Sequence, residues 1–176
     1  MSSKTFVFFV LFVVRLGEAY GGAFGGSSPI HSGTLTAVNG TVEIFSNPSD
    51  QATGEPPFIR FEGKTYTIKT AKIGAKLLLE EVIRTGLDGK AKLVFSNGDT
   101  ITIGPGTSYR IDSDTKNDKK PPSLNIIYGK IRALISSQGP RSGMRVNTPT
   151  AVAGVRGTYF YVGVAPSNQA TQISVL

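Results

Sequence analysis

The sequence predicts an all-β protein: a single domain of short antiparallel strands, arranged as a β-solenoid-like roll or a sandwich. From residue 33 onward, apolar and polar side chains alternate through short segments, which is typical of strands with one buried face. Turn-forming residues interrupt these segments at short intervals, and the chain carries 21 glycines and 10 prolines. Short strands separated by regular turns favour a sheet architecture over a helical one.

The first residues predict a secretory signal peptide at 1–19. Lys4 gives a positive start, the apolar run Phe6–Val14 follows, and Gly17-Glu18-Ala19 offers a small-x-small cleavage site. The run is shorter than the roughly 20 apolar residues that a bilayer-spanning helix needs. We therefore expect an exported protein, periplasmic or extracellular, with no membrane span after signal cleavage. Because Arg15 closely follows the run, an uncleaved N-terminal anchor is the alternative.

The folded domain is expected at 33–176, after a flexible Gly/Ser-rich leader at 20–32. Three hairpins are predicted within it. Segments 35–38 and 41–45 flank Asn39-Gly40, whose residues suit the positive φ angles of a tight type I′ turn. The other two hairpins join paired segments across a Gly-containing turn: 58–61 with 65–68, and 91–95 with 100–103.

The segment Lys76–Ile83 is ambiguous because it contains good helix formers. Gly74 and Thr85-Gly86 would limit a helix there to about two turns, so an extended path is preferred. Further strands are expected after a Gly104-Pro105-Gly106 corner and on either side of a turn at Gly129: 108–111, 124–128 and 130–135.

A weak internal repeat has a strand-Gly-strand form at 35–42 and 125–131, with the first half of a third copy at 171–176. The chain stops where the turn glycine of that third copy would come. The last strand is then left without a sequence partner. An open strand edge can pair with another chain, so Ile173 and Val175 mark the expected partner edge.

The composition excludes several classes of protein. No Cys is present, so neither a lipid anchor on cysteine, nor a disulfide, nor a thiolate metal site can form. The net charge of +7 would draw an exported chain to anionic surfaces such as phospholipid, lipopolysaccharide or cell-wall polymer. Because the basic residues are spread along the chain, a role in solubility is the simpler interpretation. They are not interleaved with aromatic residues, which argues against nucleic-acid binding.

No catalytic, metal-binding or cofactor-binding set is visible, so we expect a protein that is not an enzyme. The only histidine, His31, lies in the leader without Cys or carboxylate neighbours, which rules out a triad or zinc site. The segment 112–123 resembles a calcium loop only faintly, because its ligand and glycine positions are wrong. Nothing in the sequence brings two carboxylates together for glycoside hydrolysis; the candidates would be Glu80, Glu81 and Asp99.

The most distinctive stretch is Val146–Phe160, an apolar run of small residues that holds a single Arg and a single Pro. It predicts two short extended segments with a tight corner at Ala153-Gly154. Arg156 lies between Val155 and Gly157, and a buried guanidinium would need carboxylate or carbonyl partners. We therefore expect Arg156 to act as a structural clamp through Asp99 or backbone oxygens. The alternative is an exposed Arg that contacts a partner.

Three blocks of sequence resemble the FecR-type periplasmic domain. They are 82–95, 97–107 and the run from Thr148-Pro149 to Phe160, and together they place the strongest match at 82–162. Residues 33–73 resemble the opening of the family only loosely. The residues that carry the signature are expected to have a structural role: Thr148, Pro149, Gly154, Arg156, Gly157 and Thr158.

The resemblance implies an all-β module on the outer side of the inner membrane. Familiar members relay a signal from an outer-membrane receptor to a cytoplasmic sigma factor, and they carry an intracellular segment before a membrane helix. This chain has only Met1–Thr5 before its apolar run, so it resembles a stand-alone exported member without sigma-regulating function. We also expect it to be truncated at the C-terminus relative to the family.

The resulting hypothesis is a non-catalytic envelope protein that acts by protein–protein contact, as an interaction or signal-sensing module with an unknown envelope protein as partner. The strand edge near the C-terminus is its expected contact surface. The alternative is a cell-wall or carbohydrate-binding module. Its ligand would be held by exposed aromatic side chains with nearby Arg and Lys: Tyr109, Tyr128, Tyr159 and Tyr161.

Overall fold

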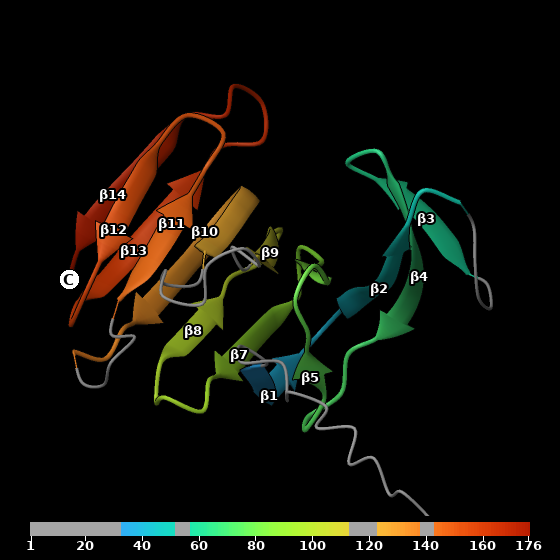
Figure 1. Ribbon diagram of the computed structural model, residues 1–176, viewed down its shortest axis with the longest axis horizontal. Coiled ribbons are helices and arrows are strands. Elements are labelled where there is room, and N and C mark those ends of the chain that lie inside the picture. The colour runs from blue at the N-terminus through green and yellow to red at the C-terminus, as the bar shows by residue number, and fades with distance from the viewer. Residues whose placement is uncertain (1–32, 52–56, 113–122, 138–142) are drawn as a thin grey trace, which may run out of the picture.

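Figure 1 shows the computed structural model, which describes residues 33–51, 57–112, 123–137 and 143–176. Within these ranges every regular element is a strand, which confirms the all-β prediction. None of the described residues belongs to a helix long and apolar enough to cross a bilayer. The predicted signal peptide at 1–19 and leader at 20–32 lie outside the described residues and stay predictions.

The strands form two sheets that share the long strand β10. Sheet A has the order β5 (Lys76–Leu77), β1 (Gly33–Asn39), β7 (Lys90–Val94), β8 (Thr100–Ile103), the second half of β10 (Ser123–Leu134), β13 (Tyr159–Val164) and β14 (Thr171–Val175). Sheet B has the order β3 (Phe58–Phe61), β4 (Lys64–Thr70), β2 (Val42–Ser49), β6 (Val82–Thr85), β9 (Ser108–Asp112), the first half of β10, β11 (Met144–Asn147) and β12 (Val152–Val155). Neighbouring strands are antiparallel, except that β11 runs parallel to β10.

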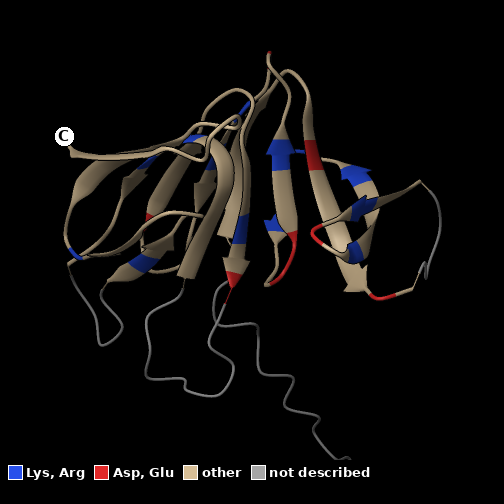
Figure 2. Cartoon of the chain, turned by 90° about the horizontal axis from the view of Figure 1, so that it is seen from above, with Lys and Arg blue, Asp and Glu red and all other residues tan. Residues whose placement is uncertain are grey.

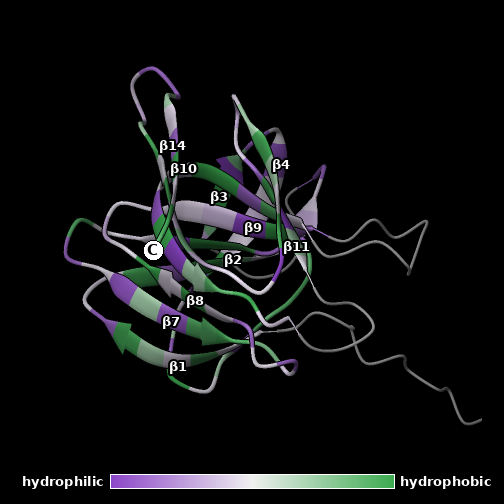
Figure 3. Cartoon of the chain, turned by 90° about the vertical axis from the view of Figure 1, so that its left-hand side faces the viewer, coloured by the Kyte–Doolittle hydropathy of each residue, from purple (hydrophilic) through white to green (hydrophobic). Residues whose placement is uncertain are grey.

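The two sheets enclose one main core, because each contributes the inward-facing half of its alternating residues. The alternation is visible along β7 and β8 in Figure 3. Sheet A supplies residues such as Leu35, Leu93, Ile101, Ile131 and Phe160, all of them fully or almost fully buried. Sheet B supplies the facing layer, with residues such as Ile44, Ile83, Ile111, Leu124 and Val146. Strands β1, β2 and β5 thus belong to the same core as the C-terminal strands.

A smaller apolar cluster lies on sheet B around Phe45, Tyr66 and Val82. Phe45 and Tyr66 come from paired strands, and their rings lie 6.2 Å apart between centroids. Phe61 of the β3–β4 hairpin meets Phe45 edge-on. This cluster explains why the hairpin stays attached to a sheet whose main apolar face is turned elsewhere.

The chain passes between the two sheets four times along a line that we call the seam: residues 40–41, 85–89, 104–107 and 129–130. Neighbouring crossings are joined by backbone hydrogen bonds. The Gly86 N–H donates to Thr41 O (2.8 Å), the Gly106 N–H to Gly86 O (2.9 Å), and the Gly104 N–H to Lys130 O (2.9 Å). The four crossings therefore stack side by side as one edge of the sandwich.

Two buried threonines reinforce the seam. The Thr85 hydroxyl donates to Gly104 O (2.7 Å) and accepts from the Thr107 N–H (2.9 Å). The Thr107 hydroxyl accepts from the Lys130 N–H (2.9 Å) and lies 3.1 Å from Lys130 O. These bonds satisfy backbone groups that leave one sheet before they enter the other.

The predicted hairpin across Asn39-Gly40 is wrong, because β1 and β2 enter different sheets and do not pair. Gly40 has a φ of 62°, as the turn would require, but Asn39 does not have a positive φ. A Cβ on Gly40 would lie 2.4 Å from Asp88 O, and the Thr41 N–H donates to the Asp88 carboxylate (3.2 Å). The glycine therefore permits close packing of two seam crossings rather than a tight turn.

The expected strand pair around Gly129 is also wrong. Residues 123–134 form one strand, β10, and Gly129 with a φ of 100° bends it from sheet B into sheet A. The strand-Gly-strand repeat thus marks two seam crossings. Three other local predictions are confirmed: the hairpins β3–β4 and β7–β8, and the corner at 104–106. No helix forms in 76–83, but the expected extended path is interrupted by a turn at Leu79-Glu80, where Glu80 has a φ of 64°.

Candidate interaction surface at the C-terminal end

The signature run Val146–Phe160 builds the end of the sandwich that carries the C-terminus. It forms the end of β11, a turn at Thr148–Ala151, strand β12, a second turn at 156–158 and the start of β13. The expected corner at Ala153-Gly154 is wrong, because both residues lie inside β12. Instead, the first turn is closed by the Thr148 N–H, which donates to Ala151 O (2.8 Å).

The first turn is fastened to the beginning of β14 by hydroxyl groups. The hydroxyls of Thr148 and Thr150 lie 2.8 Å and 2.7 Å from that of Thr171. Thr150 also donates to Gln169 O (2.9 Å). Pro149 lies exposed at the tip of this turn. The signature therefore connects the last strand of sheet B with the last strand of sheet A.

Arg156 lies exposed in the second turn, so the premise of a buried clamp does not hold. Its guanidinium makes no ion pair with a described residue. The expected partner Asp99 is buried and accepts instead from the Ser136 N–H (2.7 Å) and the Asn97 amide (2.9 Å). Arg156 is thus exposed, as the alternative requires, and a contact with a partner stays a prediction.

The residues after Arg156 shape the second turn. Gly157 has a φ of 60°, and a Cβ there would lie 2.8 Å from the Cβ of Ser137. The Thr158 hydroxyl donates to Arg156 O (2.9 Å). Both residues thus shape the turn that carries Arg156, and the structural role expected of the signature stays a prediction.

Among the described strands, β12 pairs only with β11 and β14 only with β13, so each sheet has an open edge at this end. The Leu176 N–H donates to Tyr159 O and the Ala165 N–H to Ala170 O, which fixes the phase of the β13–β14 ladder. In an antiparallel ladder, opposite residues that exchange backbone hydrogen bonds alternate with opposite residues that do not. Thr171, Ile173 and Val175 are therefore the residues of β14 whose backbone N–H and C=O groups point away from β13.

Exposed apolar side chains accompany these free backbone groups. Val175 is 76% exposed, Val152 on β12 is 70% exposed and Ile173 is 39% exposed. Ile173 lies opposite Val162 and Val175 opposite Phe160, both of them core residues. The apolar inner layer of sheet A thus continues to an edge that the described chain does not cover.

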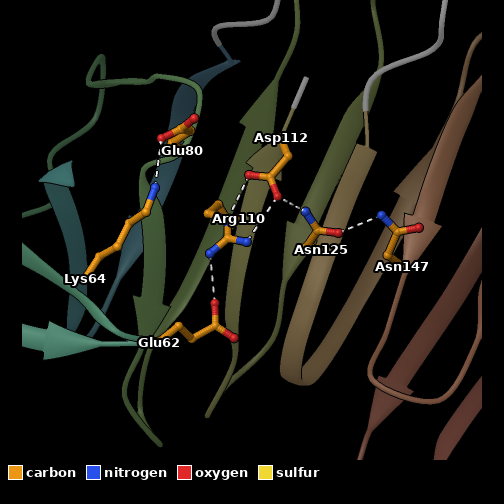
Figure 4. A network of polar contacts seen from close by, with 7 residues as sticks. All are labelled: Glu62, Lys64, Glu80, Arg110, Asp112, Asn125 and Asn147. Atoms are coloured by element: carbon orange, nitrogen blue, oxygen red, sulfur yellow. Dashed lines mark hydrogen bonds and ion pairs between the residues drawn. The ribbon is translucent and has the colours of Figure 1, made fainter. Parts of the chain in front are cut away.

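A second polar feature lies on the outer face of sheet B (Figure 4). Arg110 donates to both oxygens of Asp112 (2.8 and 3.1 Å) and to Glu62 (2.8 Å). Asp112 also accepts from Asn125, which in turn accepts from Asn147 (2.7 Å). The hydrogen bond with Asp112 raises the pKa of Arg110.

This network joins strands far apart in sequence, and hydropathy patterns contain no signal for it. Its one cation, Arg110, is paired with two carboxylates, so the network stabilises the sheet rather than presenting a free cation. The part of the chain that the structure describes holds no cluster of three or more potential metal ligands. The faint calcium loop at 112–123 falls mainly outside the described residues.

A model of the FecR protein family matches residues 81–176, which is more than half of the 176-residue chain. The chain belongs to the FecR family. No curated protein and no solved structure matches it. FecR domains are associated with the cell envelope and form a regulatory, signalling family. The match begins just before β6, so β1–β5 lie N-terminal to it and complete the same two sheets.

Proposed function

We propose that this FecR-family protein is a non-catalytic, exported module that senses or relays a signal by binding another envelope protein through strand addition at the edge of β14. The observation that carries the proposal is the open edge itself. Ile173 and Val175 direct their backbone groups outward there, and their side chains extend the apolar inner layer. A strand from a partner would satisfy the backbone groups and cover the apolar side chains together.

The neighbouring residues suit a recognition role. Arg156 is exposed in the turn before β13, and Val152 is exposed on the open edge of β12. A partner that occupies the β14 edge could contact both sheets at this end. Arg is enriched at the energetically important positions of protein interfaces. Arg156 would then supply specificity, while the strand supplies most of the contact area.

The experiment is site-specific photo-crosslinking in intact cells that export the chain. A photoreactive side chain is placed at Ile173, and in a matched chain at Leu87, which is 91% exposed on the seam. We expect one adduct of defined mass from position 173 and none from position 87. An adduct with the mass of two copies would identify self-pairing and contradict the proposal of a different partner.

Two variants at position 175 test strand addition. Val175→Pro removes a backbone N–H that faces the open edge, whereas Val175→Ala keeps that N–H and shortens only the side chain. We expect the proline variant to lose most of the adduct and the alanine variant to keep most of it. Equal adduct from both variants, or equal crosslinking from Leu87, would show that the edge is not the contact.

A further inference from the structure

The strands of sheet A carry basic residues but no acidic ones. Their described segments contain no Asp or Glu. The strands of sheet B, in contrast, carry both signs of charge, and three of their basic residues form ion pairs: Lys64, Arg84 and Arg110. Figure 2 shows that most acidic residues lie away from the C-terminal end of the molecule. The outer face of sheet A is thus a cationic surface.

Four of the cations lie in register on that outer face. Lys92 lies opposite Thr102, Thr102 opposite Arg132, and Arg132 opposite Tyr161. Lys90 and Lys130 lie two residues earlier on β7 and β10, on the same face. Strand spacings place the Cα atoms of these four residues at the corners of a rectangle of about 10 by 7 Å, with β8 running through its middle.

The space between these cations is hollow. A groove of about 540 Å³ is lined by Lys90, Thr102, Gly104, Lys130, Arg132 and Tyr161, among others. A second hollow shares Lys130 and Tyr161 with it and continues across Gly163 towards Gln172 on β14. In the second hollow the Tyr161 hydroxyl lies over Gly163, where a Cβ would lie 2.6 Å from it.

The basic side chains that line the groove, and Lys92 beside it, are free to meet an external anion. Lys90, Lys92, Lys130 and Arg132 are exposed, and none forms an ion pair with a described residue. Acidic side chains in the adjoining turns are engaged elsewhere: Asp88 accepts from Thr41, and buried Asp99 accepts from Ser136. Unpaired cations that line a concave surface focus the electrostatic field on a bound anion.

We propose that this groove binds an acidic polysaccharide, with the polymer lying along β8 and its carboxylates paired to the lysines and Arg132. The hydroxyls of Thr102 and Tyr161 suit sugar hydroxyls, and the Tyr161 ring offers a face for a sugar. A single-stranded nucleic acid would require a succession of aromatic platforms, whereas Tyr161 is the one aromatic residue that lines the described groove. A flat lipid surface would not use a hollow between the cations. The proposed site is centred on β8 and uses the outer face of sheet A, whereas the proposed partner contact uses the backbone edge of β14 and the side chains of Ile173 and Val175, so the two proposals can fail independently.

The test is isothermal titration calorimetry of the full chain with an alginate oligosaccharide, which carries a carboxylate on every sugar. A neutral cello-oligosaccharide of equal length is the control ligand. We expect the alginate oligomer to bind and to weaken as salt rises, and the neutral oligomer not to bind. Replacing Lys130 and Arg132 together by Glu should weaken alginate binding by about tenfold or more.

Two further variants separate the groove from charge in general. Lys69→Glu combined with Arg145→Glu makes the same change in net charge at two exposed cations outside the groove, and it should leave binding nearly unchanged. Thr102→Tyr fills the middle of the groove without changing charge, and it should abolish alginate binding while the melting temperature stays near that of the unaltered chain.

Three results would overturn the proposal. Equal weakening by both charge-reversal pairs would show non-specific attraction. Unchanged alginate binding by Thr102→Tyr would show that the groove is not the site. Binding to phosphatidylglycerol vesicles or to oligothymidylate, with none to alginate, would assign the face to a lipid surface or a nucleic acid instead.

Discussion

Tyr109 is a residue whose chemistry depends entirely on burial. It lies on the inner face of β9, is completely inaccessible to solvent, and its hydroxyl has no hydrogen-bond partner within the described chain. Burial raises the pKa of this phenol, because the phenolate would be charged in an apolar core. In the unfolded chain the phenol titrates near pH 10. The stability that depends on the neutral phenol is therefore present below about pH 10 and is lost as the pH rises above it.

Tyr109→Phe should reveal both effects. At neutral pH we expect the free energy of unfolding to rise by about 1 kcal/mol, because an unsatisfied buried hydroxyl is removed. Above pH 10 the variant should lose less stability than the unaltered chain, since the ionisation that favours unfolding is gone. Urea unfolding at pH 7 and pH 11 measures both quantities. An identical loss of stability in the two proteins between these pH values would contradict the assignment.

Asp99 and Arg156 show the limit of single-residue inference. The residue types were suited to a bidentate pair, but residue type alone cannot say which acceptor is nearer. In the fold, Asp99 is buried at the β7–β8 turn, where its carboxylate accepts from the Ser136 backbone N–H and from the Asn97 amide. Arg156 lies in an exposed turn. The two residues lie in different turns because of pairing between strands that are distant in the sequence, and the local sequence carries no information on that pairing.

At the scale of elements, local hairpins were predictable and the seam was not. The β3–β4 turn has positive φ at both Glu62 and Gly63, as a two-residue type I′ loop requires. Gly40 and Gly129 give the same kind of turn signal, but each lies at a crossing between the two sheets. The crossings depend on close contacts with Asp88 and Thr107, which are distant in the sequence. Strand β14 was predictable because residues 171–176 repeat the first half of the strand-Gly-strand pattern.

The bend of β10 rests on Gly129, and a matched pair of alanine variants tests it. A Cβ at Gly129 would lie 2.4 Å from the Thr107 Cα in the seam, whereas Gly98, with a similar φ of 87°, has open space around it. Gly98→Ala should cost about 1 kcal/mol, the penalty of a left-handed conformation. Gly129→Ala should cost more than about 3 kcal/mol, because backbone in two strands must also move. Urea unfolding measures the difference, and equal costs would show that the seam can adapt.

At the scale of the whole molecule, the two sheets depend on residues that the family match does not include. Strand β1 pairs with β7 in sheet A, and β2 pairs with β6 in sheet B, so residues before 81 supply the strands that pair with one edge of β7 and one edge of β6. Leu35, Ile44 and Leu77 also fill the main core. The same organisation leaves uncovered the two surfaces to which we propose ligands: the β14 edge at one end and the cationic face of sheet A.

This dependence predicts that residues 81–176 do not fold alone. Removing β1–β5 would expose the ladder groups of β6 and β7 and would open the core along one side, and unpaired strand edges with exposed apolar residues favour aggregation. We expect the fragment to show no cooperative urea transition and to bind hydrophobic dyes, whereas residues 33–176, which hold the complete described fold, should unfold in one transition. A cooperative transition in the shorter fragment would mean that β6–β14 form an independent unit and that β1–β5 are an addition to it. If the shorter fragment shows no cooperative transition, the N-terminal strands are an obligatory part of the sandwich, because they close the core that positions both the β14 edge and the groove.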